Sequence, residues 1–263
     1  MIKARAIPCL LLKDQGLVKT VKFGSPTYIG DPLNAVRIYN EKEVDELIFL
    51  DITATNEKRE PNYDLIGKIA QECFMPFSYG GGVRSVEAIK KLLRLGVEKV
   101  ILNTATHENP QLLREAAKSL GSSTVIAAMD IKRSLFGGYK RYIRSGTRAV
   151  PGDLVECAKM LEEQGAGELF INSIDRDGVM GGYDVEIISR ITNSVGIPVI
   201  ACGGAGNLEH VKELIQKTNV SAAAAGSIFV YHGRIKGVLI NYPKRSELDE
   251  INSIQDRRVG GEV

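Results

Sequence analysis

Short apolar segments alternate with longer amphipathic segments along this chain, and the alternation limits its fold more than any other feature. Apolar runs of about four to eight residues predict buried strands, and apolar residues every three to four positions predict helices packed over them. Regular alternation of strand and helix is typical of a parallel sheet. Eight such units within 263 residues predict one α/β domain, a closed (β/α)8 TIM barrel. The expected strands are 5–12, 46–51, 76–79, 99–103, 125–130, 168–172, 198–201 and 222–226.

The second half of the chain repeats the first. The segment "ELIFLDIT", which starts at Glu46, resembles "ELFINSID", which starts at Glu168, and Gly81 of "YGGG" corresponds to Gly204 of "CGGA". A repeat of this length indicates a duplicated half-barrel and not a solenoid. We therefore expect one domain over 1–263, with half-barrels at about 1–120 and 121–240 and a C-terminal tail at 241–263 that forms a short, fraying helix.

The repeat draws attention to Leu11. The segment "VIAAMDIKR" of the second half aligns with "AIPCLLLKD" of the first, so Asp130 corresponds to Leu11. Enzymes with this fold place reactive groups at the carboxyl ends of the strands. One half therefore carries a carboxylate at the end of its first strand, where the other carries a leucine. The simplest reading of Leu11 alone is a core residue.

Glycine-rich or hydroxyl-rich segments follow two strands in each half: "YGGGV" and "LNTA" in the first, "CGGAG" and "AGSIF" in the second. Such a turn lets backbone N–H groups approach an anion, and the helix that follows adds its positive end. Two symmetric sets indicate a substrate with a phosphate or other anionic group at each end. The alternative is that these glycines only permit tight turns.

Four of the expected strands begin with a charged residue: Arg5, Glu46, Lys99 and Glu168. Their positions put these charges at the amino-terminal mouth of the barrel, opposite the catalytic face. Charges that face inward would be costly unless they were paired, so two ion pairs could close this mouth. Spacing alone slightly favours the other interpretation, which is four solvated charges at the starts of strands.

Composition excludes several classes of function. A formal net charge of +2 without a basic block argues against a nucleic-acid-binding protein. No apolar stretch is long enough to span a membrane. The four cysteines lie far apart and the three histidines do not cluster, so neither a disulfide framework nor a metal site is expected. These features predict a cytoplasmic protein with reduced thiols, no metal and no cofactor.

The chain resembles the cyclase subunit family of imidazole glycerol phosphate synthase from end to end. The resemblance is carried by "DPLNAVRIYNEKEVDELIFLDITAT", "YGGGV", "NTA", "AAMDIKR", "ACGGAG" and, most specifically, "SIDRDG" followed by "GYD". It implies a TIM barrel that docks a glutaminase at its amino-terminal mouth and conducts ammonia along its interior. It also implies that Arg5, Glu46, Lys99 and Glu168 gate the entry of ammonia, which reverses the preference for solvated charges.

The resemblance also implies roles for residues at the carboxyl-terminal face. Lys19 matches a lysine on a mobile first loop that closes over the substrate. Asp130 matches one of two aspartates that serve as general acid and base in ring closure. The phosphates of a small-molecule substrate are expected near Gly82, Asn103, Thr104, Asp177, Gly178, Gly204, Gly226 and Ser227.

Leu11 departs from the family pattern, because the second aspartate is expected at this position. A positioned acid or base supplies roughly 10²–10⁴-fold in rate, so ordinary cyclase (lyase) activity should be impaired. Some bacteria carry a second copy of the cyclase subunit that resembles this chain. With a glutaminase-like partner, such second copies supply ammonia to a third enzyme that makes acetamidino sugars for surface lipopolysaccharide. We therefore expect an ammonia-channelling subunit of a glutamine amidotransferase complex.

Two alternatives remain open. The chain could be a true cyclase of histidine biosynthesis in which Asp14 or Asp51 compensates for Leu11, or a scaffold that only activates a glutaminase. Thr53, Thr55 and Ser173 could line the upper part of a tunnel, although core packing is the simpler interpretation.

Overall fold

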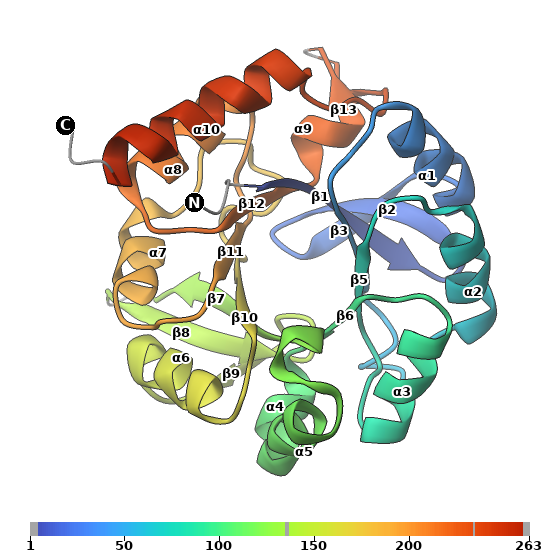
Figure 1. Ribbon diagram of the computed structural model, residues 1–263, viewed down its shortest axis with the longest axis vertical. Coiled ribbons are helices and arrows are strands. Elements are labelled where there is room, and N and C mark those ends of the chain that lie inside the picture. The colour runs from blue at the N-terminus through green and yellow to red at the C-terminus, as the bar shows by residue number, and fades with distance from the viewer. Residues whose placement is uncertain (1–4, 135–136, 234, 260–263) are drawn as a thin grey trace.

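A closed barrel of eight parallel strands forms the centre of the molecule, as the sequence predicted (Figure 1). The computed structural model describes residues 5–134, 137–233 and 235–259. In the barrel β1 pairs with β12 and β4, and pairing of β7 with β10 completes the ring. The barrel strands are β1 (Arg5–Lys13), β4 (Leu47–Asp51), β5 (Phe77–Gly80), β6 (Lys99–Leu102), β7 (Val125–Arg133), β10 (Glu168–Ser173), β11 (Val199–Cys202) and β12 (Ala222–Ala225).

Helices surround the barrel on its outside (Figure 1). Several begin at a side chain that accepts a hydrogen bond from the first turn, as Ser85 and Asn109 do. This contact satisfies backbone donors that have no partner within the helix. The helices are α1 (Pro32–Glu41), α2 (Tyr63–Glu72), α3 (Val86–Arg94), α4 (Thr104–Glu108), α5 (Pro110–Leu120), the 3₁₀ turn η1 (Ser122–Thr124), α6 (Leu154–Glu163), α7 (Val185–Thr192), α8 (Leu208–Lys217), α9 (Ser227–Val230) and α10 (Arg245–Val259).

The first strand of each half continues beyond the barrel into an antiparallel hairpin, which the sequence analysis did not predict. β1 pairs with β2 (Gly16–Val21), which pairs with β3 (Gly24–Gly30). β7 pairs in the same way with β8 (Tyr139–Ile143), followed by β9 (Arg148–Val150). A third, short hairpin consists of β13 (Tyr231–His232) and β14 (Gly237–Val238). The first two hairpins stand at the carboxyl ends of the barrel strands and contribute side chains to the pocket described below.

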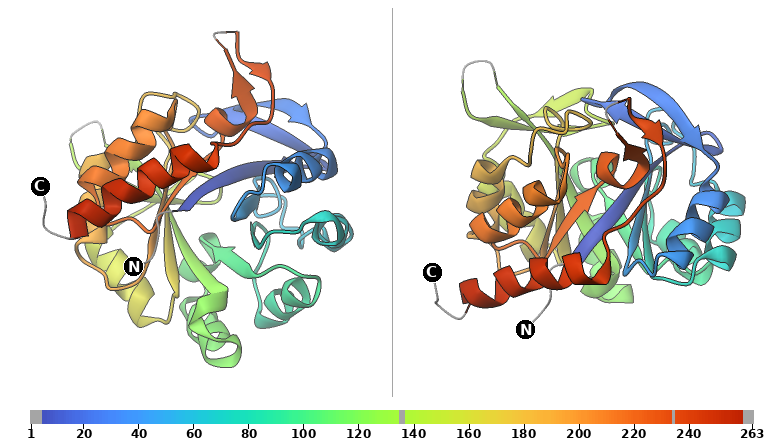
Figure 2. Two further views of the ribbon diagram at one scale, coloured as in Figure 1. Left: turned by 45° about the horizontal axis from the view of Figure 1, so that its top comes forward. Right: turned by 90° about the horizontal axis from the view of Figure 1, so that it is seen from above.

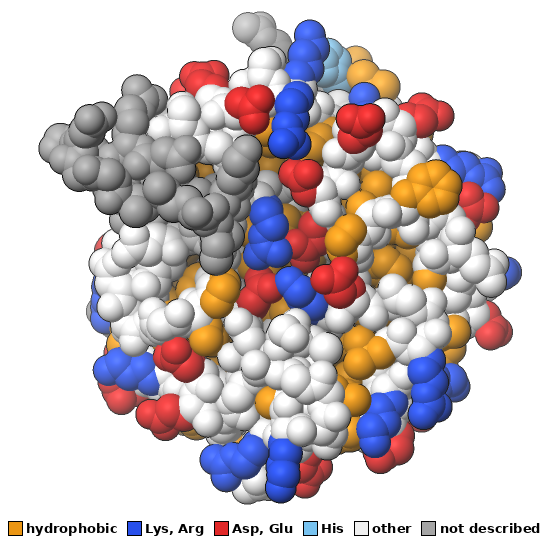
Figure 3. All heavy atoms as spheres, in the orientation of Figure 1, with side chains coloured by type: hydrophobic (Ala, Val, Ile, Leu, Met, Phe, Trp, Pro, Cys, Tyr) orange, Lys and Arg blue, Asp and Glu red, His pale blue; other side chains and the backbone are white. Residues whose placement is uncertain are grey.

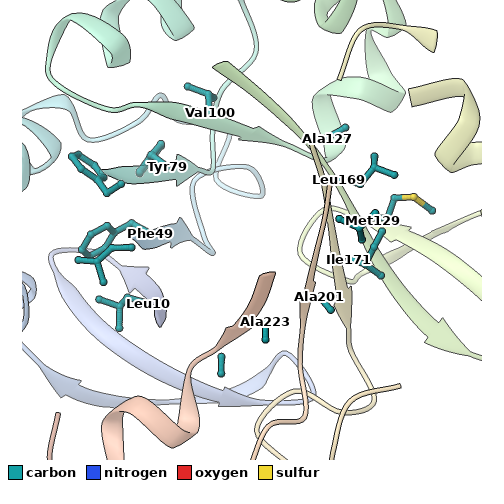
Figure 4. Close-up of a cluster of buried hydrophobic side chains, with 14 of the residues drawn as sticks. Leu10, Phe49, Tyr79, Val100, Ala127, Met129, Leu169, Ile171, Ala201 and Ala223 are labelled. Atoms are coloured by element: carbon teal, nitrogen blue, oxygen red, sulfur yellow. The ribbon is translucent and has the colours of Figure 1, made fainter. Parts of the chain in front are cut away.

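Side chains of the barrel strands alternate between two apolar cores. One set, including Leu10, Phe49 and Leu169, points outward to the helices (Figure 4). The other set fills the barrel interior: Ile7, Cys9, Ile48, Ile101, Ile126, Ala128, Phe170, Ile200, Cys202, Ala222 and Ala224. These residues of the interior column are apolar apart from the two thiols, and they lie between the charged mouth and the pocket, whose wall includes Cys9 and Cys202. The buried Ser78, which donates to Glu46, lies at the mouth end of the interior.

The C-terminal helix is longer than expected. α10 packs along α8, with Leu248 and Ile251 buried beneath it. Lys212 of α8 forms an ion pair with Glu250. Figure 2 shows α10 lying across the outside of the barrel. The sequence analysis expected a short helix that frays toward the C-terminus. The last residues of this tail, 260–263, lie outside the described part of the chain. No helix in the described residues is both long and apolar enough to span a membrane.

Candidate active site

A pocket with a volume of about 180 Å³ opens at the carboxyl ends of the barrel strands. Strands from both halves and the β2–β3 and β8–β9 hairpin regions contribute to its wall. The predicted residues that line it are Leu11, Lys19, Gly82, Asn103, Thr104, Asp130, Asp177, Gly178, Gly204, Gly226 and Ser227. The structure thus brings together all residues predicted for chemistry or phosphate binding. The four predicted gate residues do not line this pocket and lie at the amino-terminal mouth.

The first of two possible anion sites lies after β5 and β6. Gly82 has a left-handed backbone (φ 72°), and a Cβ there would lie 2.8 Å from the carbonyl oxygen of Arg59. Only glycine fits this turn without strain. The Gly82 N–H donates to Thr55 Oγ1 over 3.3 Å, so the hydroxyl of Thr55 helps to hold the turn. Thr104 begins α4 on the neighbouring strand end. We propose this cradle as one phosphate site.

The second possible anion site lies on the opposite side of the barrel, after β11 and β12. A Cβ at Gly204 would lie 2.1 Å from the Gly182 oxygen, and one at Gly178 2.2 Å from the Thr20 oxygen. These close backbone approaches explain why both positions are glycines. Gly226 and Ser227 complete this part of the pocket wall. The two cradles could hold the two ends of one bisphosphorylated molecule, as the repeated glycine pattern indicated.

Lys19 lies beside the second cradle. It belongs to β2 and pairs with Thr27 of β3, so the structure places it in a hairpin strand and not in an irregular loop. Its Nζ lies 3.9 Å from Asp177 Oδ1 and 2.6 Å from the position of a Cβ added to Gly226. Asp177 also accepts hydrogen bonds from Thr20 Oγ1 (2.7 Å) and from the Phe23 N–H (3.1 Å). The hairpin is therefore held over the pocket by Asp177, with a buried cation at the anion site.

Asp130 lies on β7 where the barrel part of the strand leads into the hairpin with β8. The predicted strand ended at this residue, whereas β7 continues to Arg133. Asn103 Nδ2 donates to its Oδ2 over 2.8 Å. Burial raises the pKa of Asp130 from its ordinary 3.8 to about 7, although the nearby charge of Arg141 and the bond from Asn103 oppose the rise. A carboxyl with a pKa near neutrality can both take up and release a proton, so Asp130 is suited to proton transfer.

Leu11 lies on the pocket wall and pairs in register with Leu50 of the neighbouring strand. Of the two carboxylates considered as substitutes for the missing acid, Asp51 lines the pocket and Asp14 does not. Asp51 accepts the N–H groups of Thr53 and Ala54 and forms an ion pair with Arg59 (2.9 Å). Asp14 lies in the exposed β1–β2 turn and does not line the pocket. The position that corresponds to Asp130 therefore offers an apolar surface.

The four charges at the amino-terminal mouth form one network. Arg5 bonds to Glu46 (2.6 Å) and to Glu168 (2.9 Å), and Lys99 bonds to Glu168. Burial raises the pKa of Glu46, against the opposing charges of Arg5 and Lys99. In Figure 3 charged side chains of both signs gather at the centre of this face. The ion-paired arrangement is thus the one present, and it closes the end of the apolar column.

Lys99→Ala tests whether this network gates ammonia. The substitution removes one of the two cationic partners of Glu168 and opens space at the mouth. In a complex with a glutaminase we expect the ratio of aminated product to hydrolysed glutamine to fall at least about twofold, because a partly buried ion pair is broken. The measurement is the amount of aminated product and of free ammonia formed per glutamine hydrolysed, and free ammonia should rise as product falls. The exposed Lys118→Ala is the matched control. An unchanged ratio would count against the gate.

Three groups near the pocket were not identified from the sequence. Asn172 pairs in register with Asp130 and lines the pocket, and its buried Oδ1 has no hydrogen-bond partner among the described residues. Arg141 of β8 is buried behind Asn103. Cys9 and Cys202 are buried in the pocket wall. The repeat could have indicated Asn172, since it ends the strand beside Asp130, but nothing in the sequence separates Arg141 from surface arginines.

The remaining predictions for this region have mixed outcomes. Thr55 lines the pocket, whereas Thr53 and Ser173 hold neighbouring turns. Core and turn packing is therefore the better interpretation for those two. Within the described residues no group of three or more metal-ligating side chains converges, so the site offers no cluster for a metal ion there.

Comparison with known proteins places the chain among others of similar length. The sequence model of the family described as "Histidine biosynthesis protein" matches residues 5–236. "Putative imidazole glycerol phosphate synthase subunit hisF2" of Pseudomonas aeruginosa is 52% identical over 249 residues, which cover 95% of this chain and 99% of that protein. A similarly named subunit, hisF3, of Vibrio vulnificus is 46% identical, with 94% and 95% covered. "Imidazole glycerol phosphate synthase subunit HisF" of Streptococcus mutans is 41% identical, with 88% and 92% covered.

Proposed function

Because the chain belongs to the histidine biosynthesis protein family, as a cyclase-type subunit of the imidazole glycerol phosphate synthase kind, we propose that it conducts ammonia. A glutaminase bound at the amino-terminal mouth supplies the ammonia, which passes along the barrel to the carboxyl-terminal pocket. There it serves amidotransfer to an acetamidino sugar of lipopolysaccharide biosynthesis, carried out with a third enzyme in the cytoplasm.

The observation that carries this proposal is Leu11. The cyclase reaction needs two proton-transferring groups. Asp130 offers one, whereas the other carboxylates of the pocket wall, Asp51 and Asp177, are bonded to Arg59 and to Thr20. Leu11 cannot exchange a proton, and both nearby carboxylates are either bonded to other groups or outside the pocket. The loss of the acid leaves the mouth network and the interior intact, which are the parts that conduction requires.

The interior supports passage of a neutral molecule. From the mouth up to the pocket wall the interior is lined by buried apolar side chains, and several of them are small, such as Ala128, Ala222 and Ala224. A charged ammonium ion would lose its hydration in this column at a cost of several kcal/mol or more, whereas neutral ammonia loses far less. The charged network at the mouth and the apolar column therefore suit NH₃ and exclude NH₄⁺.

A second candidate is a true cyclase of histidine biosynthesis. It is favoured by Asp130, whose pKa of about 7 matches a proton-transfer role, and by the two glycine cradles on opposite sides of the pocket. This candidate requires a second proton donor at or near Leu11, and the pocket wall there is formed by Leu11 and Leu50.

A cyclase assay with ammonium salt separates the two candidates. The purified chain is given ammonium and the ribulosyl aminoimidazole carboxamide substrate, and imidazole glycerol phosphate is measured. We expect a rate at least about 10²-fold below that of an ordinary cyclase, since one proton-transferring group is absent. Product at an ordinary rate would refute the proposal and support histidine biosynthesis.

A further inference from the structure

Arg141 is a buried arginine whose hydrogen bonds all go to neutral groups. Its side chain is only 3% exposed. Its guanidinium donates to Thr106 Oγ1 (2.9 Å), to Cys157 Sγ (3.2 Å), and over longer distances to the backbone oxygen (3.4 Å) and Oδ1 (3.5 Å) of Asn103. Its Nε has no partner among the described residues. Burying a charge without a directly bonded counter-charge is costly, so a nearby charge should account for Arg141.

That charge belongs to Asp130, and Asn103 lies between the two. Asn103 receives the Arg141 guanidinium at its oxygens, while its Nδ2 donates to Asp130 Oδ2 (2.8 Å). A carboxamide has its acceptor and its donors on opposite sides. Arg141 at the oxygen, together with the Tyr142 backbone oxygen that accepts from Nδ2 over 3.3 Å, therefore holds the amide with its N–H groups toward Asp130.

The contacts run from Arg141 through Asn103 to Asp130. The two halves of the barrel differ at the positions of Arg141 and of Asp130. In the second hairpin Arg141 pairs with Ile131, the residue after Asp130. The matching pair in the first hairpin is Leu17 with Leu12, the residue after Leu11. Leu17 is as deeply buried as Arg141. The carboxylate and the arginine thus occur together in one half, and both are replaced by leucine in the other.

We propose that Arg141 is a positioning residue that favours the ionised form of Asp130, through its own charge and through the amide of Asn103. The inference concerns the charge state of Asp130, so it holds for either candidate function. Thr106 and Cys157 hold the guanidinium in place from α4 and α6.

The other groups that face Asp130 do not replace Arg141. Asp177, in the turn after β10, disfavours ionisation of Asp130. Lys19 of β2 is directed to Asp177, and Asn103 of β6 and Asn172 of β10 are neutral. Among the groups that shift the pKa of Asp130, Arg141 is the positive charge that lowers it against the effect of burial.

The test is a titration of Asp130 in Arg141→Met, observed by carbon-13 NMR of labelled aspartate and assigned by the signal missing from Asp130→Asn. We expect the pKa of Asp130 to rise from about 7 by at least about one unit, which lowers its ionised fraction at pH 7 roughly fivefold. The exposed Arg148→Met, which removes the same charge from the adjacent strand, is the control and should leave the titration unchanged.

An unchanged or lowered pKa in folded Arg141→Met would overturn the proposal. Arg141→Lys provides a second measurement, which also serves if the methionine variant does not fold. Lysine keeps the charge but loses the planar contact with Asn103, so a smaller rise is expected. Loss of packing alone would not shift the pKa of Asp130 selectively. In the lysine variant, an unchanged or lowered pKa of Asp130 would contradict the role assigned to the amide of Asn103.

Discussion

Leu11→Asp is expected to raise the rate of imidazole glycerol phosphate formation by about 10²–10⁴-fold, the usual contribution of one positioned acid or base. The new carboxyl would lie where the hairpin of β1 begins, as Asp130 lies where the hairpin of β7 begins, on the wall of the same pocket. The Asp130 half already has its hydrogen bond from Asn103 and its buried arginine. The measurement is the ammonium-dependent cyclase rate of the variant divided by that of the unaltered chain.

Leu11→Asn is the matched control for this experiment. Asparagine has nearly the same size and polarity as aspartate but cannot transfer a proton at neutral pH. We expect Leu11→Asn to remain at the rate of the unaltered chain, and Asp130→Asn to abolish the gain made by Leu11→Asp. Equal rates for the aspartate and asparagine variants would show that the missing acid does not limit the reaction.

Asp130→Asn is expected to stabilise the folded protein at pH 8 by about 4 kcal/mol, the order of magnitude that corresponds to a pKa raised from 3.8 to about 7. Because burial raises the pKa of Asp130 in the folded state even with the attraction of Arg141 included, ionisation of Asp130 opposes folding. This cost is absent below about pH 4, develops between pH 4 and 7, and is complete above pH 7. Asparagine removes the charge and keeps an oxygen that can accept from Asn103.

Urea unfolding of both proteins at pH 8 and at about pH 4.5 measures this effect. The gain should be several times larger at the higher pH. Asp14→Asn removes a carboxylate from an exposed turn and should change the free energy of unfolding by less than about 0.5 kcal/mol. A gain of equal size at both pH values would show that the charge of Asp130 is not what destabilises the fold.

The barrel and the residues of its pocket could be predicted from the sequence because local patterns determine them. Each strand is an apolar run, and glycines mark backbone positions with left-handed angles, as at Gly82 and Gly178. Residues at the carboxyl ends of parallel strands must meet in a closed barrel, so Asp130 and Asn103 were expected together. The internal repeat then located Leu11 opposite Asp130 without any knowledge of the structure.

Features that depend on register and side-chain packing could not be predicted in the same way. The spacing of Arg5, Glu46 and Lys99 fits both solvated and paired charges, and only the stagger of the strands brings them together. Arg141 lies in a segment for which no strand was predicted, between a lysine and a tyrosine. Its burial depends on contacts with helices α4 and α6. The β2–β3 hairpin contains charged residues and turn glycines, which hid its strands.

The central claim is that ammonia released from glutamine travels inside this barrel. The most direct measurement combines the chain with its glutaminase, the acceptor enzyme, a sugar-nucleotide acceptor, amide-¹⁵N glutamine and an excess of unlabelled ammonium, and determines the isotope in the product. The account predicts a product amidine that is predominantly ¹⁵N-labelled, because channelled ammonia does not mix with the solution. A product with the isotope ratio of the bulk ammonium would contradict it.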